Sequence, residues 1–250
     1  MMEKRGIFRV VLFLLFMVMN PLHGQVKQTH SIVFGFLKLK DQHNLGMVFN
    51  GIQLEYRYVV LWKIYDTEML FQPKIAVGAA FNRGITGIQI RCVPVNVTWI
   101  MPFYESAQHS LKGGFTVTGD YSFQMYPGLH NGHLFWMTEI GFSPLVYYGY
   151  QWEKSKISFN LQEFLFGFTS HTRKNDPYFY SLKIGDFFLK PYEDMRFGSL
   201  HNLHHTAAAV EFIPDVSESN SIVYEFDYFN LFYGMRFERL NHNFQWKRSL

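Results

Sequence analysis

The sequence predicts an all-β protein, a closed antiparallel transmembrane β-barrel of about ten strands, with eight or twelve as alternatives. The main observation is strict alternation from Leu134 to Tyr150, where one face is apolar and the other is small and polar. Period two places each set on one face of a strand, and this strand is far longer than the usual roughly 5–6 residues. A second long strand, Ile157 to Thr169, follows a short polar turn. The two together are typical of a transmembrane β-hairpin.

The composition is the second observation. Aromatic residues make up 19% of the chain and charged residues 17%, yet the mean hydropathy is only −0.06. Alternating apolar and polar residues average to neutral, so a barrel can be rich in Phe and Tyr without being hydrophobic overall. A secreted β-sandwich also alternates, but it rarely carries so many aromatic residues on such long strands. No linker or low-complexity region divides the chain, so a single domain is expected.

The N-terminus has the features of a cleaved signal peptide over residues 1–24. Basic residues such as Lys4 precede an apolar run from Val10 to Met19, and the small residue Gly24 lies at the expected cleavage point. The run is about half as long as the roughly 20 residues that a spanning helix needs. The barrel domain is therefore expected over residues 25–250.

Other strands are predicted where apolar and polar residues alternate between turn residues. In chain order they are Ser31 to Leu39, Gly51 to Leu61, Met69 to Phe81, Ile88 to Met101, Gly114 to Met125, Tyr178 to Ile184, Leu203 to Ile213 and Ser221 to Glu238. Asn241 to Leu250 is expected to be a further short strand or a tail. With the hairpin above, this makes about ten strands, in keeping with the even number of single-chain bacterial barrels.

Two changes of phase are expected along these strands. The outward residues switch from even to odd numbers around Pro94, as they would at a β-bulge where Pro replaces a ladder donor. A second change is expected near Asn230, after which Leu231 and Phe237 would face outward. The segment Tyr233 to Phe237 has the pattern of a closing strand.

The signal peptide, the alternation and the aromatic strand ends resemble those of the small outer-membrane β-barrel proteins of Gram-negative bacteria. The resemblance is one of architecture and covers nearly all of the mature chain. It implies a location in the bacterial outer membrane, with outer-membrane lipid and lipopolysaccharide as partners and other envelope proteins as further candidates. Many such barrels end on an aromatic residue, whereas this chain ends on Leu250. The residues after Phe237 are therefore expected to be a tail.

Charged residues fall on the predicted inward faces, with acids and bases nearly balanced. They are Glu55, Arg57, Glu68, Lys74, Arg91, Asp120, Glu139 and Lys183, followed by Glu225, Asp227, Arg236 and Glu238. Side chains fill much of the lumen in a barrel of about ten strands, so a salt-bridged plug is expected. A charged lining for a narrow passage or a ligand cleft is the alternative. Aromatic residues predicted to point inward, such as Phe135, Phe164 and Phe166, favour a filled lumen.

The segment Ser199 to His205 holds the candidates for chemistry. His201, His204 and His205 could bind a transition metal, although His clusters in loops are more often solvated turns. Ser199 and His201 would share a strand face, with Asn202 to orient the imidazole. This resembles the outer-membrane phospholipase and lipid A deacylase families, in which the His precedes the Ser. No metal or other cofactor is predicted.

The remaining features narrow the function. The net charge is +3 and the Lys and Arg residues are dispersed, so nucleic-acid binding is not predicted. Cys92 is the single cysteine, so no intramolecular disulfide can form. A non-enzymatic structural or accessory component of an envelope assembly is expected. A narrow channel or small-solute binder is the first alternative, and a lipid-modifying hydrolase is the second.

Overall fold

The computed structural model describes residues 25–41, 46–129, 133–171, 195–216, 220–232 and 237–248. These residues form β1 (Gln25–Asp41), β2 (Val48–Ile64), β3 (Thr67–Phe71), β4 (Lys74–Asn82), β5 (Ile85–Glu105), β6 (His109–Tyr126), β7 (His133–Trp152), β8 (Ser155–Glu163), β9 (Phe166–His171), β10 (Arg196–Ser199), β11 (Leu203–Ile213), β12 (Asn220–Leu231) and β13 (Phe237–Arg248). Within the described residues, no helix has the length and apolar character needed to cross a membrane.

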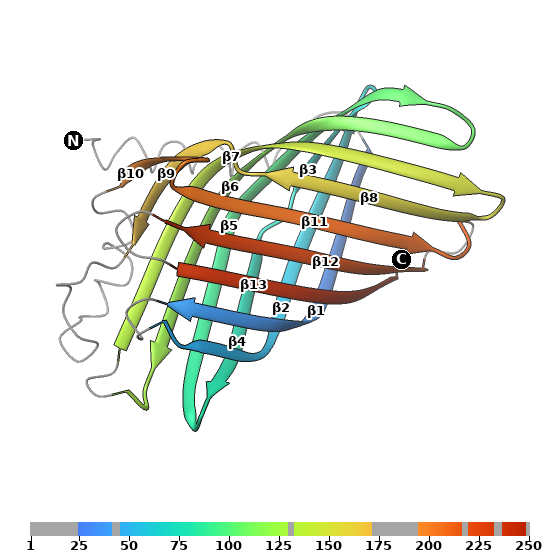
Figure 1. The fold of residues 1–250 in the computed structure, drawn as a ribbon. Coiled ribbons are helices and arrows are strands. Elements are labelled where there is room, and N and C mark those ends of the chain that lie inside the picture. Colours follow the sequence, from blue (N-terminus) through green and yellow to red (C-terminus); the bar gives the residue numbers. More distant parts are fainter. Residues whose placement is uncertain are drawn as a thin grey trace.

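These segments build one closed antiparallel barrel of ten strands, as the alternation predicts. Three of the strands are each interrupted once, so that β3 and β4, β8 and β9, and β10 and β11 are successive parts of the same strand. The first strand, β1, pairs with β2 on one side and with β13 on the other, which closes the sheet. In Figure 1, β8, β11, β12, β13 and β1 form the near wall, in front of β5, β6 and β7.

The C-terminal part of the barrel differs from the prediction. A single strand from Ser221 to Glu238 is wrong, because β12 and β13 pair as an antiparallel hairpin in which Leu231 lies opposite Phe237. The tail predicted after Phe237 is wrong as well, and the alternative of a further strand in this region is confirmed, since Phe237–Arg248 is the strand that pairs with β1. The number of strands is therefore confirmed with a different last strand.

The predicted change of phase near Asn230 is also wrong. The register between β11 and β12 runs without a shift from Leu203–Leu231 to Phe212–Ile222. Leu231 and Phe237 face the interior, where they are 2% and 0% exposed. The inward side chains where β12 ends and β13 begins are apolar. In the sequence, the unbroken alternation of these strands therefore looks as if the inward and outward positions had exchanged.

Register shifts occur at several places on the long strands, one of them between Pro102 and Tyr104. The bulge predicted around Pro94 is confirmed, because the register between β5 and β6 shifts between Cys92 and Val95. Another bulge, not predicted, lies at Phe164 and Leu165, where the register of the strand against β7 shifts by one residue. Phe164 is 0% exposed and points inward as predicted, but Phe166 is 44% exposed and points outward. The extra residue in the strand explains that reversal.

The two faces of the barrel differ in chemistry as the alternation predicts. Exposed apolar side chains surround the barrel on its outer face. Among them are Ile32, Phe36, Leu54, Ile75, Val77, Ile140, Val146, Phe159, Phe166 and Phe244. The inner face of β6 holds Thr116, Thr118, Asp120, Ser122 and Gln124, all buried. A soluble protein rarely exposes such a continuous apolar surface, whereas a transmembrane barrel requires it.

The two ends of the barrel are named here by the strands that reach them. The terminal end holds Gln25 and Arg248 together with two-residue turns such as Glu153-Lys154. The distal end is where Asp41 and Phe237 lie opposite each other. The turn after Asn82 is at the distal end, where Arg83 and Gly84 have φ of 45° and 87°. Positive φ at both central residues matches the twist of the two flanking strands.

Several predicted features lie outside the described residues. They are the signal peptide over residues 1–24, the strand Tyr178 to Ile184 with Lys183, and Arg236.

Opposite faces of one strand should respond differently to a positive charge. Ile75 is exposed on the outer face of β4, and Gln72 is half-buried between β3 and β4 on the other side of the strand. We expect Ile75→Lys to destabilise the folded barrel by roughly 2–4 kcal/mol, because the ammonium enters the lipid-facing band. Gln72→Lys should cost much less. Urea titration of protein folded into liposomes measures both, and equal losses would contradict the assignment of faces.

Candidate functional site: the barrel interior

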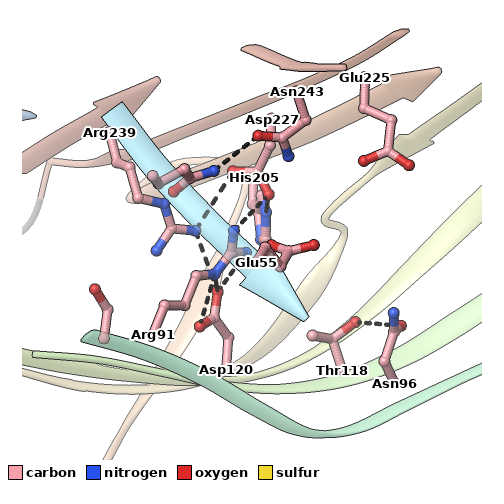
Figure 2. Close-up of polar contacts among 12 residues, drawn as sticks. Glu55, Arg91, Asn96, Thr118, Asp120, His205, Glu225, Asp227, Arg239 and Asn243 are labelled. Carbon is pink, nitrogen blue, oxygen red and sulfur yellow. Dashed lines mark hydrogen bonds and ion pairs between the residues drawn. The ribbon is translucent and has the colours of Figure 1, made fainter. Parts of the chain in front are cut away.

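The interior has an apolar region and a charged region. Apolar side chains gather at the distal end, where Leu39, Phe49, Tyr126, Phe135 and Phe237 are packed in one buried cluster. These side chains lie within a few residues of the strand ends, so the interior near that end is filled by apolar packing. The middle of the barrel, by contrast, is crossed by ion pairs (Figure 2).

The first crossing is made by Asp120. It lies on the inner face of β6 and is 1% exposed. Arg91 on the neighbouring strand β5 binds it, with 2.7 Å between Nη2 and Oδ2. Arg239 on β13 binds the same carboxylate, with 3.1 Å between Nη2 and Oδ2. In the strand order of the barrel β6 and β13 are half a turn apart, so this contact spans the lumen.

The second crossing is made by Asp227 on β12. Its Oδ2 lies 3.0 Å from Nη1 of Arg91, and β5 and β12 are again half a turn apart. Its Oδ1 lies 3.4 Å from Nη2 of Arg239. Two Asp and two Arg residues therefore alternate around a closed circuit that ties opposite walls together, as Figure 2 shows.

His205 extends this circuit to a third part of the wall. It points inward from β11, and its Nε2 lies 3.5 Å from Oδ2 of Asp227. Its Nδ1 lies 2.9 Å from Oε2 of Glu139 on β7. The ring of Phe229 packs edge-on against the imidazole and lies 5.3 Å from the Arg239 guanidinium carbon. Both ring nitrogens thus face carboxylates, and an aromatic side chain shields the group.

A second ionic group lies beside the first. Arg57 on β2 is held between Glu55 on its own strand and Glu225 on β12, with both guanidinium edges engaged. Lys74 on β4 is directly opposite Arg57 in the register and is half-buried. Glu68 pairs with Lys112 at 2.8 Å.

The predicted inward positions can now be placed. Glu55, Arg57, Arg91, Asp120 and Glu139 are all buried in the interior. Glu68 and Lys74 are half-buried. Lys183 is outside the described residues.

Two central members of the network were not predicted, and one predicted member is elsewhere. Arg239 was missed because the mistaken phase and tail removed its strand from the barrel. His205 was considered only as a metal ligand, although its position two residues after Leu203 on an alternating strand places it inward. Glu238 was predicted to point inward, but its neighbour Arg239 does, and Glu238 lies 3.6 Å from Lys40 at the distal end.

The Ser199 and His201 pair does not share a strand face. β10 ends at Ser199, and the chain turns so that the Asn202 amide donates to the Ser199 carbonyl at 2.9 Å. The Asn202 side-chain oxygen accepts from the Ser199 amide at 2.7 Å, so this side chain stabilises the turn. His201 is exposed in that turn.

The three histidines of this segment point to different places. His201 lies in the turn, His204 faces outward on β11, and His205 faces the interior. In the part of the chain that the structure describes, no three His, Cys, Asp or Glu side chains are grouped as metal ligands would be.

The network can be tested at Asp120, which two Arg residues share. Asp120→Asn removes the charge and leaves both guanidinium groups short of a buried partner, so we expect a loss of about 3–5 kcal/mol in unfolding free energy. Ser122→Ala, two residues along the same inner face, is the matched control and should lose far less. Urea titration followed by the mobility of unboiled samples on gels measures both. A wild-type midpoint in Asp120→Asn would contradict the proposed role of the ion pairs.

Comparison with known proteins gives structural neighbours only. No protein-family model matches the sequence, and no curated protein matches it. The outer membrane protease OmpT from Escherichia coli aligns with a TM-score of 0.49 at 8% identity, over 88% of this chain and 94% of that chain. The beta domain of the Bordetella autotransporter BrkA aligns with a TM-score of 0.32 at 8% identity, over 88% and 99%. The CymD monoaromatic hydrocarbon channel aligns with a TM-score of 0.21 at 8% identity, over 90% and 89%. At these scores the assignment of the fold rests on the strand pairing of this chain itself.

Proposed function

We propose that this chain is an integral outer-membrane β-barrel with a closed lumen, acting as a non-enzymatic structural or accessory component of an envelope assembly. The observation that carries the proposal is the pair of contacts that cross the lumen, Asp120 with Arg239 and Arg91 with Asp227. With the apolar cluster at the distal end, they fill the space through which a solute would pass.

The proposed location rests on the outer surface. Exposed apolar side chains surround the barrel, and backbone groups in lipid must pair within the protein, which a closed barrel achieves. The two-residue turns after Ile64 and Trp152 lie at the terminal end, and the turn after Asn82 is a short turn at the distal end. The two ends of the longest connection in the sequence, His171 and Arg196, both lie at the distal end. Bacterial barrels place short turns in the periplasm and long loops outside, so we assign the distal end to the cell exterior.

The charged interior favours a scaffold over a passage. Each carboxylate of the central circuit already binds two cations, so an entering ion would have to displace a bonded partner from a buried position. Removing one partner of a buried pair is strongly unfavourable, at about 3–5 kcal/mol. Asp120 and Asp227 therefore offer an entering cation no position that a guanidinium group does not already hold.

A narrow channel is the second candidate. It is supported by the run of small hydroxyl side chains Thr116, Thr118 and Ser122 on the inner face of β6, next to half-buried residues at the terminal end. Such a channel would need the central circuit and the distal cluster to rearrange together.

Conductance in planar lipid bilayers separates these two functions. We expect no single-channel steps from the wild-type barrel, with an open bacterial porin as the positive control. The variant Phe135→Ala with Phe237→Ala thins the distal cluster but leaves the ion pairs in place, so it should also stay closed. Steady steps from the wild-type protein would favour the channel. The same preparation should migrate faster when unboiled, which shows that the barrel is folded.

A further inference from the structure

The outer surface is not apolar everywhere. Glu163 at the end of β8 lies opposite Thr206 on β11, and His204 is two residues before Thr206 on the same face. The alternation assigns this face to the outside, because Ile157, Phe159 and Leu161 on β8 are exposed and His205 on β11 points into the lumen. A carboxylate, an imidazole and a hydroxyl therefore meet on the lipid-facing side.

This group, here called the outer polar site, lies within the apolar band. Along its own strand, Leu161 is exposed before Glu163 and Leu165 is exposed after it. Farther along the same strand, Phe168 on β9 is exposed nearer the distal end, and Phe232 is exposed just after β12. Lipid-facing apolar side chains thus lie on both sides of Glu163 along the barrel axis, so the site is not at the water boundary.

The contacts within the outer polar site are incomplete. The Thr206 hydroxyl donates to Oε2 of Glu163. The other carboxylate oxygen, Oε1, lies 3.8 Å from Nδ1 of His204, with side chains 36% and 42% exposed. That separation is too long for a direct hydrogen bond. Among the described residues, neither Oε1 of Glu163 nor Nε2 of His204 has a hydrogen-bond partner, and the imidazole otherwise contacts the ring of Phe232.

Other outward histidines each have one ring nitrogen in a direct hydrogen bond. His30 bonds to the Tyr56 hydroxyl at 2.7 Å, and His242 bonds to the Tyr224 hydroxyl at 2.7 Å. Neither pair includes a carboxylate. Ionisable side chains facing hydrocarbon are costly and mark functional positions, so Glu163 is a candidate for a further hydrogen-bond partner.

We propose that the outer polar site binds a hydroxyl or amide N–H carried at acyl-chain depth by a membrane lipid. The inference rests on the proposed outer-membrane location. A hydroxyl placed between Glu163 and His204 can donate to Oε1 and accept from the imidazole, which spans the 3.8 Å gap. An ester carbonyl only accepts, so it cannot satisfy the carboxylate. The chemistry therefore selects lipids with hydroxylated or amide-linked acyl chains over simple diacyl glycerolipids.

The test uses two lipids that differ only in the hydroxyl. One probe is a bis-phosphorylated glucosamine disaccharide lipid with 3-hydroxymyristoyl chains, and the other has unsubstituted myristoyl chains. The full barrel is purified in detergent and its unboiled gel mobility is checked. Both lipids are then added together, and the bound fraction of each is read by native mass spectrometry. We expect wild type to prefer the hydroxylated lipid by about tenfold, the ratio that one hydrogen bond to a charged group supports.

Variants assign the preference to the site. Glu163→Leu should abolish the preference while leaving an apolar outer face, and Thr206→Val should reduce it. Tyr224→Phe, which removes a hydroxyl elsewhere on the outer face, is the matched control and should keep it. Equal binding of the two lipids by folded wild type, or an unchanged preference in Glu163→Leu, would overturn the inference. A protein that shows no heat-dependent mobility and fractionates away from the outer membrane would instead contradict the proposed function.

Discussion

The whole structure depends on the pairing between the first and the last strand. β1 and β13 are joined by a continuous register from Phe34–Phe244 to Asp41–Phe237, and without it the sheet would have two open edges. Open edges in hydrocarbon leave amide and carbonyl groups unpaired, which no membrane protein tolerates. Closure also brings the inner face of β13 opposite β6. The interior chemistry follows from this geometry, because Arg239 can reach Asp120 only across a closed barrel.

The interior combines two ways of filling a lumen. The distal end uses apolar packing among side chains such as Phe135 and Phe237. The middle uses charge, with Asp120 and Asp227 each bound by both Arg91 and Arg239. A buried ion pair adds little net stability relative to apolar packing, but losing one partner is severe. The circuit therefore serves to hold opposite walls in one arrangement more than to add stability.

The outer surface and the lumen were predictable to different extents. Alternation correctly placed the inner face of β6 and the bulge at Pro94, since hydropathy changes with period two and Pro cannot donate to a ladder. It failed where both faces have similar chemistry. The inner residues Leu231 and Phe237 at the distal end are as apolar as lipid-facing ones, so polarity could not indicate the phase there.

The candidate site shows the same limit. Six of the charged residues predicted to point inward, Asp227 among them, are buried there, because an ionisable residue on an alternating strand has only one favourable face. Arg239 and His205 were missed as members of the network, and their partners on β6, β7 and β12 are far away in the sequence. Such cross-lumen pairing depends on the strand order and shear of the closed barrel, which no local pattern reports. The bulge at Phe164 reverses the face of Phe166. The sequence there has no proline or other local signal, so this reversal could not be predicted.

Closure by β13 can be tested directly with engineered disulfides. The variant Phe34→Cys with Phe244→Cys, in a Cys92→Ser background, joins two residues that are partners in the register between β1 and β13. The variant Phe34→Cys with Leu240→Cys has the same faces but is four residues out of register, because Leu240 pairs with Lys38. Mild oxidation of the folded barrel should form a disulfide in the first variant and none in the second, read as a mobility shift of boiled, non-reduced samples. A disulfide in the out-of-register variant, or none in the matched pair of a folded barrel, would contradict the closed barrel described here.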